Sequence, residues 1–116
     1  SMIVEALLHK KKLRQKEWED YDHLTRQILG TDTRDLLNTS ADELIARHAD
    51  TPDGMEKLEL AAVNMLKLAE EVDEDNPLLK SRLRQEGIQL LKYIQQHSDN
   101  YSLQRKFLIG LLETNH

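Results

Sequence analysis

The chain has 116 residues, no cysteine and a formal net charge of -5. Its length suits one domain that can bury a core without cross-links, and the missing thiols exclude disulfides, thiolate metal sites and cysteine nucleophiles. The acidic balance argues against broad affinity for nucleic acid or anionic membranes, which requires an excess of Lys and Arg.

The composition predicts an all-α fold, a compact bundle of about five helices. Leu, Glu, Lys, Arg and Gln dominate, with only 4 Gly and 2 Pro, and straight-chain residues lose little rotamer freedom in a helix. No apolar run approaches the roughly 20 residues that span a bilayer, so no transmembrane segment is expected. In residues 2–12 the apolar stretch precedes the lysines, the reverse of a secretory signal, which favours a cytoplasmic location. Ser1 is interpreted as a tag remnant, and residues 1–116 as a single helical domain.

The first helical segment is predicted at residues 2–29, which contain no Gly or Pro and precede a left-handed stop at Gly30. From residue 18 onward its expected buried face comprises Trp18, Tyr21, Leu24 and Ile28. Charged residues continue the same side toward the amino end, namely Lys10, Arg14 and Glu17. We therefore interpret residues 2–16 as a semi-independent amino-terminal helix.

A short connector follows at residues 31–37, with about one turn of helix. Ser40 and Glu43 then form a capping-box pattern, in which each side chain satisfies a backbone N–H. This pattern predicts a short helix at residues 41–49.

The next helix is predicted at residues 52–72, with Thr51 as its cap and Pro52 at its first position. Its apolar residues repeat at spacings of four and three, as expected for a central helix. They are Leu58, Ala62, Met65, Ala69 and Val72. Leu60 and Val63 fall on the opposite, polar side.

Asn76 and Pro77 form a cap and first-position pair that starts a helix ending near His97. Gly87 lies on its inner face, where the missing side chain is expected to let another helix approach closely. The other inner residues are Leu79, Leu83, Leu90, Leu91 and Ile94. A last helix starts after Asp99 or Asn100, with its apolar residues at Tyr101, Leu103, Phe107, Leu108, Leu111 and Leu112.

The histidines and acids form no complete metal motif. A di-metal helical bundle requires two Glu-x-x-His pairs, whereas this sequence has one comparable pair, Asp20 and His23, which a solvated charged face also explains. No two histidines have the spacing of a zinc site. The acidic run at residues 73–76 lacks the Gly and Glu of a calcium loop. We therefore predict no metal site.

Catalytic and cofactor motifs are also missing from the sequence. Neither a Gly-x-Ser-x-Gly elbow nor a Gly-rich phosphate loop occurs. We predict no catalytic residue and no cofactor. The alternative hypothesis is a helical enzyme dependent on a small molecule or metal, using Asp20 and His23.

The strongest charge feature is a basic run at residues 10–16, formed by Lys10, Lys11, Lys12, Arg14 and Lys16. Beside the apolar stretch at residues 2–8, it suggests a further hypothesis, a regulator that contacts nucleic acid or a membrane surface. Four acids follow at once and largely cancel the field of this run beyond a Debye length. They are Glu17, Glu19, Asp20 and Asp22. A solvated helix is the favoured interpretation.

Two helices resemble tetratricopeptide repeats. The residues that carry this resemblance are Ala62, Leu66 and Ala69 with Asp75, Asn76 and Pro77, and then Leu103, Phe107 and Gly110. The separation of Ala62 and Leu103 exceeds the usual period of about 34 residues. The resemblance therefore implies antiparallel, tetratricopeptide-like helix pairs rather than a superhelical array.

The whole chain also resembles an uncharacterised prokaryotic family of all-helical proteins. The resemblance rests on Met2-Ile3 with the lysine run, Tyr21-Asp22-His23-Leu24, Leu36-Leu37, Ser40-Ala41-Asp42-Glu43-Leu44 and Met55-Glu56-Lys57-Leu58. It implies a helical fold and transfers no site residue.

The first functional hypothesis is a non-catalytic module that binds a protein partner or itself. Its expected interaction surface consists of the apolar residues that one inward stripe does not explain. These are Ile3, Val4, Leu7, Leu8, Leu60, Val63 and Ile88. An apolar patch at the amino-terminal segment is typical of contact sites, so a homodimer is expected, with Ile3 and Leu7 in its seam. The alternative is a monomer whose amino-terminal segment folds back onto Leu60 and Val63.

Overall fold

The computed structural model describes residues 14–72, 74–99 and 103–114. Within these residues the chain forms five α-helices and one 3-10 helix, with no strand, so the all-α prediction is confirmed. The elements are α2 (Gln15–Leu29), η1 (Thr33–Asn38), α3 (Ala41–His48), α4 (Gly54–Glu71), α5 (Pro77–His97) and α6 (Leu103–Thr114). No helix in this part of the chain has both the length and the apolar character needed to cross a bilayer.

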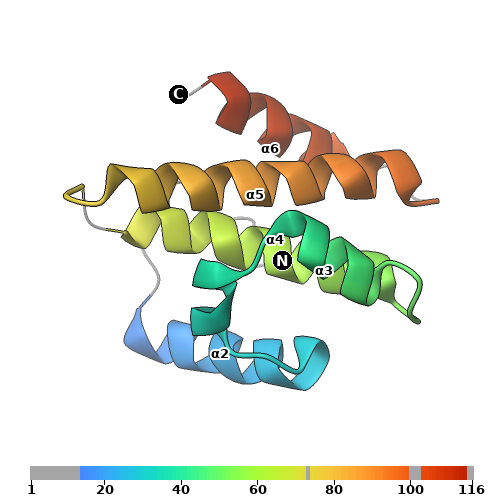
Figure 1. The fold of residues 1–116 in the computed structure, drawn as a ribbon, viewed down its shortest axis with the longest axis horizontal. Coiled ribbons are helices and arrows are strands. Elements are labelled where there is room, and N and C mark those ends of the chain that lie inside the picture. The colour runs from blue at the N-terminus through green and yellow to red at the C-terminus, as the bar shows by residue number, and fades with distance from the viewer. Residues whose placement is uncertain (1–13, 73, 100–102, 115–116) are drawn as a thin grey trace.

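Helices α4 and α5 form an antiparallel pair at the centre of the molecule (Figure 1). Helix α6 packs on α5, α2 packs on α4 at the other side, and α3 lies against both central helices. The predicted seam of α4 is confirmed, because Leu58, Ala62, Met65 and Ala69 are buried and Val72 is partly buried. Burial of these apolar side chains is the main interaction that stabilises the fold.

Helix α4 is buried on more sides than its apolar pattern predicts. Val63, expected on a polar side, is only 3% exposed, and Leu60 is partly buried against the core. Lys67 is fully buried and pairs with Glu70, with 2.6 Å between Nζ and Oε2. The expectation of an outward polar side is wrong because α2, η1, α3 and α5 all pack around this helix.

Three of the expected helix boundaries rest on short-range hydrogen bonds. Ser40 Oγ accepts the backbone N–H of Glu43 at 3.1 Å, which starts α3. Asn76 Oδ1 accepts the N–H of Leu79 at 3.4 Å, which starts α5 with Pro77 at its first position. Gly30 ends α2 in the left-handed conformation with φ 72°. The three predicted boundaries are confirmed. Of the predicted capping box, only the Ser40 half forms, since no hydrogen bond from the Ser40 N–H to the Glu43 side chain occurs among the described residues.

The start of α4 differs from the prediction by two residues, because the helix begins at Gly54 rather than Pro52. Thr51 forms a turn instead of a cap, and its hydroxyl donates to the His48 carbonyl at 2.7 Å. Gly54 lies so close to the carbonyls of His48 and Ala49 that a Cβ there would overlap the backbone. The chain therefore reverses tightly between α3 and α4.

Helix α2 begins at Gln15, because Arg14 is extended, with φ -74° and ψ 161°. The prediction of one unbroken helix through residue 14 is therefore wrong. The amino-terminal piece before Arg14 lies outside the described residues. The predicted inner face is confirmed at Trp18 and Tyr21, which are partly buried and buried, and is wrong at its other two residues. Leu24 and Ile28 are 38% and 40% exposed, while the buried residues are Glu17, Tyr21, Thr25 and Leu29.

Candidate functional site

A groove of about 310 Å³ lies between α5 and α6. Four of its residues come from α5 and one from α6, namely Gln85, Ile88, Gln89, Lys92 and Glu113. The α5 residues share one side of the helix because their spacings of three and four bring them onto neighbouring turns. The groove therefore depends on the chain folding back at the α5–α6 connection.

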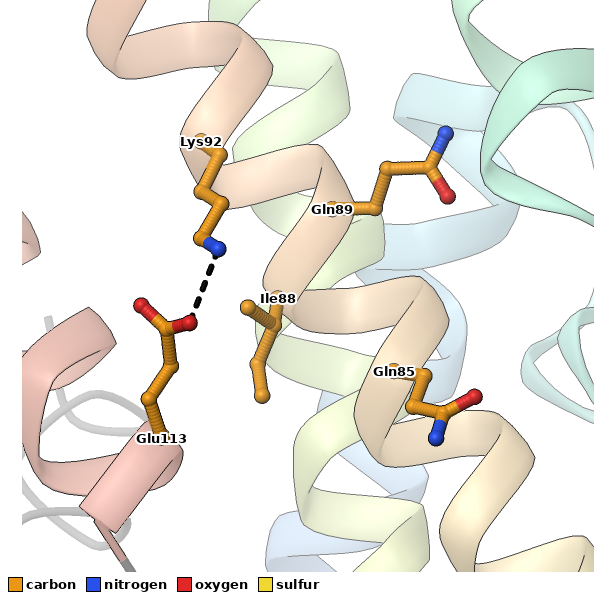
Figure 2. Close-up of a pocket in the computed structure, with 5 residues that line it drawn as sticks. All are labelled: Gln85, Ile88, Gln89, Lys92 and Glu113. Carbon is orange, nitrogen blue, oxygen red and sulfur yellow. Dashed lines mark hydrogen bonds and ion pairs between the residues drawn. The ribbon is translucent and has the colours of Figure 1, made fainter.

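An ion pair closes one end of the groove. Lys92 Nζ lies 2.8 Å from Glu113 Oε2, so the pair crosses from α5 to α6. Figure 2 shows this crossing, with Ile88 lying between the pair and Gln85. Both partners are about half exposed, and such pairs contribute roughly 0–1 kcal/mol to stability. The pair is better placed to orient a bound group than to hold the fold together.

The carboxamides of Gln85 and Gln89 extend from the side of α5 away from Glu113 (Figure 2). They lie four positions apart on the helix, which is about 6 Å along the axis. Gln89 Nε2 donates to Asp42 Oδ1 at 3.0 Å, which fixes one amide against α3. A carboxamide has two N–H donors and an oxygen acceptor, so Gln89 keeps hydrogen-bonding capacity beyond its bond to Asp42. Gln85 is exposed.

A second, shallower cavity of about 190 Å³ lies between α2 and η1. Gln15, Trp18, Glu19 and Asp22 form one stripe of α2, and Thr33 closes the other side. Asp22 Oδ1 accepts the backbone N–H of Thr33 at 3.1 Å, and its Oδ2 lies 3.3 Å from the Arg26 guanidinium. The bond between Asp22 and the Thr33 N–H fixes η1 against α2.

The pKa of the Asp22 carboxyl is lowered from its ordinary value. The largest cause is the nearby Thr33 hydroxyl, although its oxygen forms no hydrogen bond of ordinary geometry. The Thr33 N–H, Arg26 and Arg34 lower the pKa further, and desolvation by burial opposes them. Asp22 is therefore ionised at neutral pH. The cavity thus combines a carboxylate charge with the indole of Trp18.

The predicted interaction residues do not come together as one exposed surface. Ile88 lines the α5–α6 groove but is only 6% exposed. Val63 is buried in the core, so its prediction as an outward contact residue is wrong, and Leu60 is partly buried. The other predicted residues, Ile3, Val4, Leu7 and Leu8, lie outside the described residues.

The charged residues considered for chemistry are dispersed. Asp20 and His23 are exposed on α2, and no group of three or more metal-ligating side chains occurs within the described ranges. Lys16 is exposed, and Arg14 pairs with Glu17 at 3.0 Å. Lys10, Lys11 and Lys12 lie outside the described residues.

The chain matches no protein-family model, no curated protein and no solved structure. The resemblances to tetratricopeptide repeats and to a prokaryotic helical family therefore stay predictions. Sequence reasoning missed Gln85, Gln89, Lys92 and Glu113. The first three have the spacing of one helix side, but nothing in the sequence places Glu113 opposite them.

Proposed function

We propose that the chain is a protein-binding module whose α5–α6 groove receives a segment of a partner polypeptide in the cytoplasm. The observation that carries this proposal is the lining of the groove. It combines the apolar side chain of Ile88 and an ion pair between α5 and α6 with two carboxamides, one turn apart, that extend from α5 on the side away from Glu113. Binding sites typically combine apolar area with a few placed polar groups that orient the ligand.

A polypeptide suits this lining because its main chain offers both donors and acceptors. Gln85 and Gln89 can donate to main-chain carbonyls and accept from main-chain N–H groups. The side chain of a partner residue would then lie over Ile88. The antiparallel α4–α5 pair also fits the tetratricopeptide-like pairing that we propose for this fold.

Display of a random-peptide library against the immobilised protein tests the proposal. We expect peptides that bind the wild type and lose binding to Gln85→Glu, which removes a donor at the groove and adds a negative charge. Gln27→Glu is the matched control, since Gln27 is exposed on α2 and lines neither cavity. Peptides that bind both variants equally well would place the site elsewhere.

Self-association is the second form of the same function, with a second copy as the partner. Sedimentation at tens of micromolar, with Leu7→Glu and Gln85→Glu, separates the possible surfaces. A dimer lost only in Leu7→Glu would assign it to the amino-terminal segment, whereas loss only in Gln85→Glu would assign it to the groove. No enriched peptide together with a monomeric mass would contradict the proposed function.

A further inference from the structure

The cavity between α2 and η1 has an aromatic wall and, among the described residues, a carboxylate that takes part in no ion pair. Trp18 is the single tryptophan of the chain, and it is partly buried at this cavity. Glu19 is exposed beside it, and its hydrogen bond comes from a neutral donor, Gln15 Nε2, at 3.4 Å. Within the described ranges no ion pair includes Glu19.

The nearby arginines act on other carboxylates. The Arg26 guanidinium contacts both Asp22 and Asp32, and Arg14 pairs with Glu17. Arg34 acts on Asp22. Among the described residues, the Glu19 carboxylate at this cavity is therefore in no ion pair, and its negative charge favours a cationic ligand.

The same lining favours a guanidinium over an ammonium group. A guanidinium is planar and weakly hydrated, so it can stack on an aromatic face while its N–H groups bond a carboxylate. Tryptophan is the aromatic side chain that attracts cations most strongly. The side-chain oxygen of Gln15 adds one more acceptor at the cavity.

We propose that the cavity formed by Gln15, Trp18, Glu19, Asp22 and Thr33 binds the guanidinium group of an arginine residue in a partner protein. This inference rests on the proposed function, because the arginine belongs to the partner. It assigns a second contact site, on the side of the molecule formed by α2. Arginine is among the residues that most often dominate binding at protein interfaces.

Intrinsic fluorescence tests the site directly, because Trp18 is the only tryptophan and therefore the only indole reporter. The full chain is titrated with N-acetyl-arginine amide at constant ionic strength. We expect a saturable change in emission. The neutral isostere N-acetyl-citrulline amide should give none, and N-acetyl-lysine amide should bind several-fold more weakly.

Glu19→Gln and Asp20→Asn are matched variants, since each removes one negative charge from neighbouring exposed positions of α2. We expect Glu19→Gln to weaken binding about fivefold and Asp20→Asn to leave it nearly unchanged, because Asp20 does not line the cavity. Equal weakening by the two variants would show a general charge effect and overturn the site.

Two further outcomes would overturn the proposal. The absence of a saturable signal would remove the guanidinium site, and tighter binding of free arginine than of the blocked amide would indicate a small-molecule ligand instead of a partner residue. The probes do not involve the α5–α6 groove. If the arginine probe does not bind but peptides still bind in a Gln85-dependent way, only the guanidinium site is excluded and the proposed function is retained. If no peptide binds the groove but the arginine probe still changes Trp18 emission, only the groove is excluded.

Discussion

The carboxylate of Glu86 accepts a hydrogen bond from the backbone N–H of Ala41, with 2.6 Å between Oε2 and the amide nitrogen. Ala41 is the first residue of α3, where backbone N–H groups have no partner within the helix. Glu86 lies on α5, so a carboxylate distant in sequence satisfies one of these groups and complements the positive end of the helix dipole. The neighbouring bond from Gln89 to Asp42 joins the same two helices.

We expect Glu86→Ala to lower the free energy of unfolding by about 1–2 kcal/mol, because it removes a charged acceptor and leaves the Ala41 N–H without this partner. Glu86→Gln keeps an acceptor and should cost less. Chemical denaturation measures both variants. Glu71→Ala is the control, since Glu71 is exposed at the end of α4; a loss as large as that of Glu86→Ala would contradict this role.

Gly87→Ala is expected to destabilise the protein by about 1–3 kcal/mol through overpacking. A Cβ at Gly87 would lie 2.7 Å from Leu66 Cγ and 3.2 Å from the Ala62 carbonyl oxygen. Leu66 is itself buried and has little room to move. The close approach of α4 and α5 predicted at this glycine is confirmed.

Gly110→Ala provides the opposite case on α6. Gly110 is exposed, and a Cβ there would meet nothing within 4 Å. Alanine should therefore raise stability by up to about 1 kcal/mol through its higher helix propensity. Melting temperatures of the two variants should move in opposite directions, and a rise for Gly87→Ala would refute the packing argument.

Protein stability should decrease as the pH falls below about 6.5 because of His48. Burial is the main cause that lowers the pKa of His48 in the folded chain, and Lys57 and Arg47 lower it further. Below the unfolded pKa the unfolded chain therefore binds more protons at this site than the folded chain, so stability rises with pH across this window. Below the pKa of His48 in the folded chain, His48 no longer makes stability depend on pH.

Denaturation midpoints between about pH 7 and pH 5 measure this effect. His48→Gln should have a smaller slope over that range, whatever its stability at neutral pH. His23→Gln is the control, since His23 is exposed on α2. Equal slopes for wild type and His48→Gln would exclude His48 as the source.

Helix boundaries could be predicted where neighbouring residues supply the hydrogen bonds. Ser40, Asn76 and Gly30 each act within one turn of their own helix end, so their effect is visible in the sequence. The start at Gly54 could not be predicted, because it depends on how closely that residue meets the carbonyl of His48.

The candidate cavities were only partly accessible to the same reasoning. Gln15, Trp18, Glu19 and Asp22 have the spacing of one helix stripe, a signal present in the sequence. Their position opposite Thr33, however, follows from the chain reversal after α2. The α5–α6 groove required knowledge of tertiary packing, because Glu113 meets Lys92 only after α6 folds back.

The buried face of α2 was predicted only in part, because one of its buried contacts with α4 is polar. Thr25 and Asn64 are both fully buried, and Asn64 Nδ2 donates to Thr25 Oγ1 at 3.1 Å. Thr25 Oγ1 in turn donates to the Tyr21 carbonyl at 2.7 Å. The bond between Asn64 and Thr25 turns the Thr25 side of α2 toward α4. Leu24 and Ile28 therefore stay exposed, although their spacing suits burial.

A double-mutant cycle tests whether Thr25 and Asn64 act as one unit. We expect Thr25→Val and Asn64→Leu each to destabilise the protein by about 1–3 kcal/mol, because each removes a buried hydrogen bond and leaves the other polar side chain with one partner fewer. The double variant removes both polar groups and should cost clearly less than the sum of the single changes. Urea denaturation of the four proteins gives the coupling energy, and for residues in contact about 0.5 kcal/mol or more is expected. Strictly additive losses would show that the hydrogen bond does not determine how α2 packs on α4.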